Sequence, residues 1–393
     1  MPYRRTYGKR DDVQLRSEAI TLKPGIPRYD VVVIGGSQAG LAMGYHLAQK
    51  GLLFVILDAG PEVGHVWRSR WDSLALFTPA QYSGLPGMAF PAPKDTYPSR
   101  DDVASYLQSY VVRFDLPVRL ESPVTSLTKG DDSYVVATAH DRLQAHQVVV
   151  ATGPFQVPFI PPISTDFDDT VFQIHSADYR SEALLPDGQV LVVGGGNSGF
   201  QIAEELAATR KVNLAVGQRI PSLPQRLLGR DIFWWLSGAG YMKVNVGSRL
   251  GHRLSQRDAL IGSRPRRAKR AGVTIRSRLT GVQRRRALLE AGDQIDDVGI
   301  VVWATGYRLD HSWIAIPEVK DAYGHITHQR GVTPAYGLYL VGQTWQHTRG
   351  SALIGWVGND AAFLAELIAS RRAGDKESAN VMPKPTDPRL GSG

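Results

Sequence analysis

Two glycine-rich turns that recur along the chain restrict its fold more than any other feature of the sequence. They run from Gly35 to Gly40 and from Gly194 to Gly199, 159 residues apart. Each follows a β-branched run and precedes a stretch with a helical pattern, an arrangement in which backbone N–H groups hold a pyrophosphate. Each unit also closes with Ala-Thr-Gly, at 151–153 and at 304–306. The repeat predicts an α/β chain with two dinucleotide-binding Rossmann-like domains.

The two units differ at the residue that meets the adenosine ribose. Asp58 stands 23 residues after Gly35, whereas Gly217 stands 23 residues after Gly194 and is followed by Gln218 and Arg219. A carboxylate accepts a hydrogen bond from a ribose 2′-OH, whereas an arginine without an acid suits a 2′-phosphate. We therefore expect FAD at the first turn and NADPH at the second.

The individual binding candidates follow from these turns. Ser37 replaces the middle glycine of the first turn, which predicts weaker FAD binding, because that glycine normally admits the pyrophosphate. Arg219 is the first candidate for the 2′-phosphate, with Arg226 and Arg267 as alternatives. The backbone and ribose candidates are Gly35, Ser37, Gly40 and Asp58 for FAD, and Gly194, Gly196, Asn197, Ser198 and Gly199 for NADPH.

The composition excludes several classes of protein. The chain has 393 residues, 43% of them hydrophobic, and no cysteine. A disulfide reductase needs a redox cysteine pair, and thiolate-held zinc or iron–sulfur sites need cysteine too, so these classes are excluded. The sequence contains no run of about 18 uncharged apolar residues, so no membrane span is predicted. The basic start lacks the apolar segment of a signal peptide, so we expect a cytoplasmic location.

The net charge of +8 is concentrated in one segment. Between Arg249 and Arg286 there are 13 arginines and lysines against the single acid Asp258. Aromatic residues do not alternate with the basic ones there, so we favour a solvated face over a nucleic-acid site. The ten histidines form no metal-binding pattern, and no Ser-His-Asp or paired-carboxylate site rises above background.

The repeat also predicts the domain organisation. Residues 307–358 follow the second unit, and we expect them to return to the first domain. The second domain is therefore expected to be an insertion in the first. The expected parts are an N-terminal arm (1–28), a discontinuous FAD-binding domain (29–154 and 305–372), an NADP-binding domain (155–304) and a polar C-terminal tail (373–393).

Three further segments allow more than one interpretation. The loop Trp67-Arg68-Ser-Arg70-Trp71-Asp72 is either a packed loop with a salt bridge or a flavin-positioning element. The apolar run 232–236 is interpreted as core rather than pocket. His175 and Tyr179 would face each other if their segment were helical.

These motifs resemble those of the class B flavin-dependent monooxygenases, namely the flavin-containing monooxygenase group. The likeness extends over about residues 29–370 and is strongest to short bacterial members and the plant auxin-biosynthesis enzymes. The chain departs from the family fingerprint Phe-x-Gly-x-x-x-His, because Asp169 and Val171 hold the Phe and Gly places before His175. Besides the two turns, the segments that carry the resemblance are 67–74, 77–79, 84–87, 303–307 and 345–353.

The resemblance implies an activity and further site residues. FAD would be reduced by NADPH and would react with O₂ to give a C4a-(hydro)peroxyflavin, which oxygenates a small organic substrate. Trp67 and Arg68 would bind FAD, Asn197 would reach the flavin edge, and Gln346 and His347 would lie beside the isoalloxazine, with Thr78 opposite. Two alternatives stay open: an NADPH-dependent reductase or oxidase without oxygenation, and a flavin-bound redox regulator. A homodimer also stays open.

Overall fold

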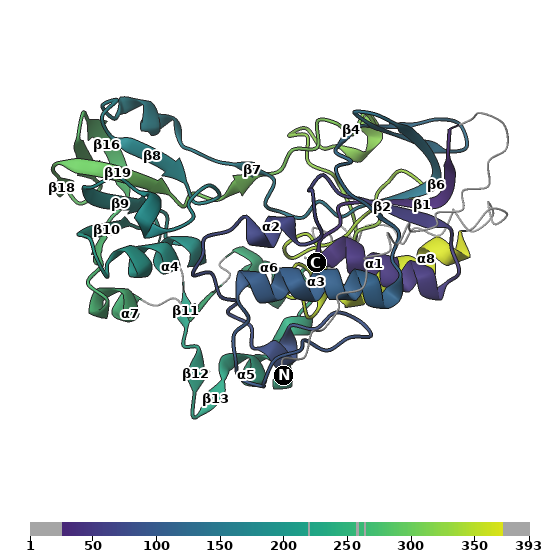
Figure 1. The fold of residues 1–393 in the computed structure, drawn as a ribbon, viewed down its shortest axis with the longest axis horizontal. Coiled ribbons are helices and arrows are strands. Elements are labelled where there is room, and N and C mark those ends of the chain that lie inside the picture. The colour runs from purple at the N-terminus through teal and green to yellow at the C-terminus, as the bar shows by residue number, and fades with distance from the viewer. Residues whose placement is uncertain (1–25, 219–220, 257–258, 263–264, 372–393) are drawn as a thin grey trace, which may run out of the picture.

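Two separate sheets organise the computed structural model, which describes residues 26–218, 221–256, 259–262 and 265–371 (Figure 1). In the first sheet, β1 lies between β2 and β6 in parallel register, with Val33 opposite both Ile56 and Val149. Its strands are, in spatial order, β3 (Val118–Arg119), β2 (Phe54–Leu57), β1 (Arg28–Ile34), β6 (Arg142–Val150), β5 (Tyr134–Thr138) and β4 (Val124–Lys129). A seventh strand, β21 (Leu338–Leu340), pairs parallel with the end of β6, so a segment far along the chain returns to this sheet.

The second sheet is entirely parallel. Its central strand β9 lies between β10 and β19, and all three are buried and mainly apolar, as is typical of a parallel sheet covered on both faces. The order is β15 (Thr274–Arg276), β10 (Val212–Ala215), β9 (Gln189–Val193), β19 (Val298–Trp303) and β8 (Phe172–His175). The two glycine turns follow β1 and β9, the inner strands of the two sheets. The α/β class is therefore confirmed.

Helices cover one face of each sheet, and strands or loops cover the other (Figure 1). One core joins the first sheet to α1 (Gln38–Gln49), α3 (Arg100–Phe114) and α8 (Val357–Ser370). Another core joins the second sheet to α4 (Asn197–Leu206) and α7 (Pro265–Arg270). The far face of the second sheet packs on a small sheet of β16 (Leu279–Gln283), β17 (Arg286–Leu289) and β18 (Gln294–Ile295).

The sheets are connected by two chain segments that pair with each other. β7 (Val157–Pro158) and β20 (Tyr307–Arg308) form a short antiparallel ladder between them (Figure 1). The remaining elements are α2 (His65–Arg68), β11 (Ser222–Leu223), β12 (Arg226–Leu227), β13 (Arg230–Asp231), α5 (Ile232–Gly238), α6 (Arg249–Gln256) and β14 (Leu260–Ile261). Across the described ranges, no helix has the length and apolarity needed to cross a bilayer.

Two segments depart from the form that their sequence patterns suggested. His175 and Tyr179 are not on a helix: β8 ends at His175 and a turn follows, in which the Tyr179 N–H donates to the His175 carbonyl at 3.1 Å. The run 232–236 is only partly core. Ile232 and Phe233 are buried, whereas Trp234 and Trp235 are exposed. The period of a short helix explains this division, because residues two positions apart lie on opposite faces.

Candidate functional site

The first glycine turn is held tightly by its own backbone. Gly35 has φ = 112°, and a Cβ there would lie 2.6 Å from the Ala151 carbonyl oxygen. A Cβ on Gly40 would lie 1.8 Å from the Gly35 carbonyl oxygen, where α1 packs against the turn. Both glycines are therefore required by the protein's own packing. They bring the N-terminus of α1 directly to the end of β1, and the Ala-Thr-Gly segment lies beside it.

Three polar side chains meet at the start of α1. Ser37 occupies the N-cap position with extended backbone (φ −91°), but its hydroxyl donates to Gln38 Oε1 at 2.6 Å and does not cap the helix. The Trp67 indole N–H points to the same oxygen at 3.3 Å. The free N–H groups of the first turn of α1 therefore lie beside a serine hydroxyl and an indole, and both Ser37 and Trp67 are close to the proposed phosphate position.

Asp58 stabilises the turn itself. One carboxylate oxygen accepts from the Gly36 N–H at 2.6 Å, and the other accepts from the Gly60 N–H at 2.8 Å. A carboxylate oxygen has more than one lone pair, so these bonds leave acceptor capacity for a ribose hydroxyl. Asp58 is therefore placed at the end of β2 as the sequence suggests, with a second, structural task that the sequence did not reveal.

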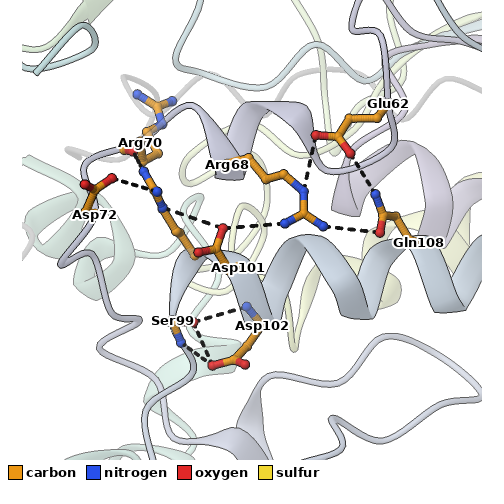
Figure 2. A network of polar contacts seen from close by, with 9 residues as sticks. Glu62, Arg68, Arg70, Asp72, Ser99, Asp101, Asp102 and Gln108 are labelled. Carbon is orange, nitrogen blue, oxygen red and sulfur yellow. Dashed lines mark hydrogen bonds and ion pairs between the residues drawn. The ribbon is translucent and has the colours of Figure 1, made fainter. Parts of the chain in front are cut away.

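Arg68 lies in a network of polar side chains rather than open to a ligand (Figure 2). Its Nε is 3.2 Å from Glu62, one terminal nitrogen is 3.5 Å from Asp101, and the other donates to Gln108 at 3.3 Å. Two carboxylates face one guanidinium, so its charge is already balanced. For Arg68, this arrangement supports the interpretation of residues 67–72 as a packed loop with a salt bridge.

The residues expected beside the isoalloxazine are mostly turned inward. Gln346 is buried, and its amide nitrogen donates to the Leu340 carbonyl at 2.9 Å. Thr78 is buried against the Ser83 hydroxyl at 3.0 Å. His347 is partly exposed, and burial of its ring lowers its pKa, so the imidazole is neutral at pH 7. Of the three, His347 alone retains an exposed side chain.

Gln343 is a candidate that sequence reasoning missed. It follows β21, and the preceding Gly342 (φ = 87°) approaches α1 so closely that a Cβ would lie 2.6 Å from Ala39 Cβ. The Gln343 side chain donates to the Gly153 carbonyl at 3.3 Å. Gln343 therefore binds the Ala-Thr-Gly exit, while the residue before it packs against the start of α1. The apolar run 338–341 ending in glycine was the available signal, because it resembles the other strand exits.

Packing requires glycine at some positions of the second turn but not at all of them. A Cβ on Gly194 would lie 2.1 Å from the Ala304 carbonyl oxygen, and one on Gly199 would lie 1.9 Å from the Gly194 carbonyl oxygen. These two are required by packing. At Gly196, by contrast, φ is −81° and a Cβ would meet nothing within 4 Å. Neither backbone nor packing requires glycine there, so the vacant space suits an external group that approaches the backbone.

Asn197 and Ser198 open α4 directly after that space. The Asn197 Oδ1 atom is buried and accepts no hydrogen bond from any residue that the structure describes. A buried acceptor without a donor costs about 1–3 kcal/mol. A ligand that brings an O–H or N–H to this point would remove that cost, which makes Asn197 a binding candidate in its own right.

A cavity of about 350 Å³ extends from this turn past the ends of β9 and β10. Gly217 and Gln218 form part of its wall, and Arg278 donates to the Gly217 carbonyl at 3.1 Å. Arg278 was not singled out from the sequence, because it follows β15, an edge strand whose neighbour only the sheet order reveals. Arg219 itself lies outside the described residues. The two alternatives are engaged elsewhere: Arg226 lies 3.8 Å from Asp95, and Arg267 lies 2.9 Å from Glu204.

His175 and Tyr179 have structural partners. His175 donates from Nε2 to the Gly306 carbonyl and accepts at Nδ1 from the Ala177 N–H, both at 3.0 Å. Burial lowers its pKa, in agreement with this neutral tautomer. The Tyr179 hydroxyl donates to Glu205 at 2.8 Å. His175 therefore joins β8 to the segment that leads back to the first sheet.

Across the described part of the chain, no group of three or more histidine or acidic side chains could hold a metal ion. The arrangement therefore offers two turn-and-helix sites for pyrophosphates, with different surroundings at their ribose ends. The chain has no cysteine, so redox chemistry at these sites would depend on bound cofactors.

Comparisons with known proteins agree with this geometry. A family model for pyridine nucleotide-disulphide oxidoreductases matches residues 32–222. An oxidoreductase of Geobacillus kaustophilus described as CzcO-like is 46% identical, over 86% of this chain and 98% of its own length. The probable indole-3-pyruvate monooxygenase YUCCA9 of Arabidopsis thaliana is 27% identical, over 86% of this chain and 88% of its own.

A solved structure is similar over nearly the whole chain. The flavin-containing monooxygenase from Stenotrophomonas maltophilia is 27% identical with a TM-score of 0.73, and the match covers 87% of this chain and 98% of that one. The resemblance found in the sequence is thereby confirmed, and the enzyme class is an oxidoreductase. The chain belongs to the family of CzcO-like oxidoreductases, and it is similar to the flavin-dependent monooxygenases in sequence and in fold.

Proposed function

We propose that the protein is an NADPH- and O₂-dependent monooxygenase that holds FAD at the first glycine turn and NADPH at the second. The observation that supports this most strongly is the contrast between the ribose ends of the two turns. Asp58 presents a carboxylate at the first. Gly217 and Arg278 present a cavity with a guanidinium at the second. A carboxylate favours ribose hydroxyls and repels a 2′-phosphate, whereas a guanidinium attracts it.

The residues of the second turn fit a nicotinamide dinucleotide on two counts. The space beside Gly196 admits a pyrophosphate to the N–H groups of α4, and the buried Asn197 Oδ1 lacks a donor within the described chain. At the first turn, Ser37 fills the corresponding place, and its hydroxyl would donate to a phosphate after leaving Gln38. We therefore keep the expectation that FAD binds less tightly than it would to a glycine at this position.

When bound, FAD and NADPH would supply the hydride transfer and the O₂ activation, and the residues of this chain would bind, orient and shield them. Asp58 would hold the FAD ribose, and the N-terminus of α1 would face its pyrophosphate. Arg278 and Arg219 would hold the 2′-phosphate of NADPH.

We further propose that residues 155–304 form an NADP-binding domain inserted in an FAD-binding domain of residues 29–154 and 305–372. The pairing of β21 with β6 supports this division, since it returns the chain to the first sheet after the second is complete. The β7–β20 ladder would be the point where the chain crosses between the domains in both directions.

One experiment tests the activity. NADPH oxidation by the purified protein would be measured against sulfides, amines, ketones and α-keto acids, with H₂O₂ followed in parallel. The α-keto acids belong in the panel because a relative is named for indole-3-pyruvate. A substrate that accelerates NADPH oxidation, lowers H₂O₂ and returns an oxygenated product supports the proposal. H₂O₂ equal to NADPH with every substrate would instead identify an oxidase.

A further inference from the structure

A hairpin with an apolar tip projects from the body of the molecule. It consists of β12, the turn Leu228-Gly229 and β13, followed directly by α5, at the bottom of Figure 1. Leu228 at the tip is 83% exposed and Leu227 is 44% exposed. Trp234 and Trp235 on the adjoining helix are 46% and 36% exposed. Apolar side chains gathered on one protrusion mark a binding surface more often than apolar side chains scattered singly.

The backbone conformation at the tip of the hairpin disfavours leucine. Leu228 has φ = 50° and Gly229 has φ = 77°, so the two-residue turn has positive φ at both central positions. Asn-Gly is the favoured pair in such a turn, because asparagine tolerates this region and leucine does not. Solvation also favours asparagine at a site this exposed. Leucine is therefore the worse choice for the free protein on both counts, which indicates a gain when the tip is buried.

The base of the hairpin is fixed, so the tip is presented rigidly. Asp231 is buried and accepts from the Tyr97 hydroxyl at 2.6 Å and from the Gln225 amide at 2.9 Å. Its second oxygen caps α5 by accepting from the Phe233 N–H at 2.8 Å. Phe233 is fully buried and stacks on Phe77. The one acid of the hairpin thus faces inward, away from the tip.

Positive charges flank the tip. Arg226 and Arg230 occupy the two strands, and the Arg230 guanidinium lies 5.3 Å from the centre of the Trp234 ring. The acid facing Arg226 is Asp95, at 3.8 Å between two largely exposed side chains, so this pair is weak. Leu227 pairs with Arg230 across the hairpin, and the Trp235 indole N–H donates to the Leu227 carbonyl at 3.1 Å, so only the Leu228 turn lies beyond this level. A leucine beyond a level of tryptophan and arginine matches the layers of a bilayer surface, where acyl chains lie below anionic headgroups.

We propose that this hairpin, with α5, docks on an anionic lipid surface, with Leu228 entering the acyl region and Leu227 at its boundary with the headgroups. The shape favours a bilayer over a second copy of the chain. A stable dimer needs about 800 Å² of complementary surface on each partner. A narrow convex tip offers little such surface, whereas a fluid bilayer adapts to it. The mode is attachment to one leaflet, without a spanning segment.

The test uses the full-length protein loaded with its cofactors and co-flotation with lipid vesicles. Vesicles of phosphatidylcholine alone are compared with vesicles containing phosphatidylglycerol, at low and high salt. Wild-type protein should float with the anionic vesicles, and salt should weaken the binding. Leu228→Asn should lower the partition coefficient about tenfold, since the apolar side chain no longer leaves water. Replacing Arg226 or Arg230 by glutamine should cost about fivefold each.

Two controls keep the result unambiguous. Leu184→Asn changes a leucine that is 70% exposed but far along the chain from the hairpin, and it should leave flotation unchanged. The melting temperature of Leu228→Asn should not fall, because asparagine suits positive φ. Equal flotation of wild type and Leu228→Asn would overturn the proposal. So would a wild-type dimer that Leu228→Asn converts to a monomer without any vesicle binding, since the tip would then be a protein interface.

Discussion

Gly196→Ala separates ligand binding from folding at the second turn. The residue has φ = −81°, and a Cβ would have no neighbour within 4 Å. Alanine therefore meets no strain in the folded protein. It also restricts the unfolded chain, which stabilises a compatible site by about 0.4–1 kcal/mol. The melting temperature should stay unchanged or rise by a few degrees, about 2–4 °C per kcal/mol.

The same methyl group would occupy the space that we assign to the NADPH pyrophosphate. A charge-assisted bond to a backbone N–H is worth about 1.5–3 kcal/mol, so its loss corresponds to roughly 10- to 150-fold in affinity. We expect the KM for NADPH to rise within that range. Bound FAD, measured by visible absorbance after purification, should not change, because the first turn is on the other sheet.

Steady-state NADPH oxidation and a thermal melt, both measured on the same preparations, test the predicted effect of Gly196→Ala. Gly238→Ala is the matched control, because Gly238 also has an ordinary φ and no neighbour within 4 Å of a Cβ. It should leave the KM unchanged. An unaltered KM in Gly196→Ala would refute the assignment of the pyrophosphate to this turn. A lower melting temperature in that variant would show that the space is not vacant in the folded protein.

Four further outcomes are expected. Gly199→Val should lower the melting temperature strongly, because a Cβ lies 1.9 Å from the Gly194 carbonyl oxygen; a stable variant with a raised KM for NADPH would contradict this. Asp58→Ala should purify with much less FAD, from the loss of about 1–3 kcal/mol of binding, and full loading would disprove the ribose role. Arg278→Ala should lower kcat/KM for NADPH about 10-fold or more and leave NADH unchanged, as steady-state kinetics with both cofactors would show. Burial lowers the pKa of His175 in the folded protein. The neutral imidazole therefore stabilises the fold above the unfolded pKa near 6.5, and this stability is lost as the pH falls. His175→Gln should reduce the change in melting temperature between pH 7 and pH 5.

The structure assigns different roles to residues that belong to the same sequence motif. Gly196 and Gly199 look alike in the sequence as glycines of one turn, yet a Cβ at Gly199 would lie 1.9 Å from the Gly194 carbonyl oxygen and one at Gly196 would meet nothing within 4 Å. Packing distances of this kind depend on how the helix sits against its own turn, so no spacing rule reveals them. Likewise, the folded chain brings Glu62 and Asp101 to Arg68, and no spacing in the sequence reveals these contacts.

The sequence by itself determined the local units of this protein. The β-branched runs, the turns at Gly35 and Gly194 and the contrast between Asp58 and Gly217 depend on short-range chemistry, since a turn and the helix after it are built from neighbouring residues. Only the tertiary structure decided what lies beside those units. It brought Arg278 to Gly217 and Gly342 to the start of α1, and it left Leu228 exposed at the tip of a hairpin. Those relations depend on sheet order and on contacts between distant segments, which a single sequence does not encode in any short pattern.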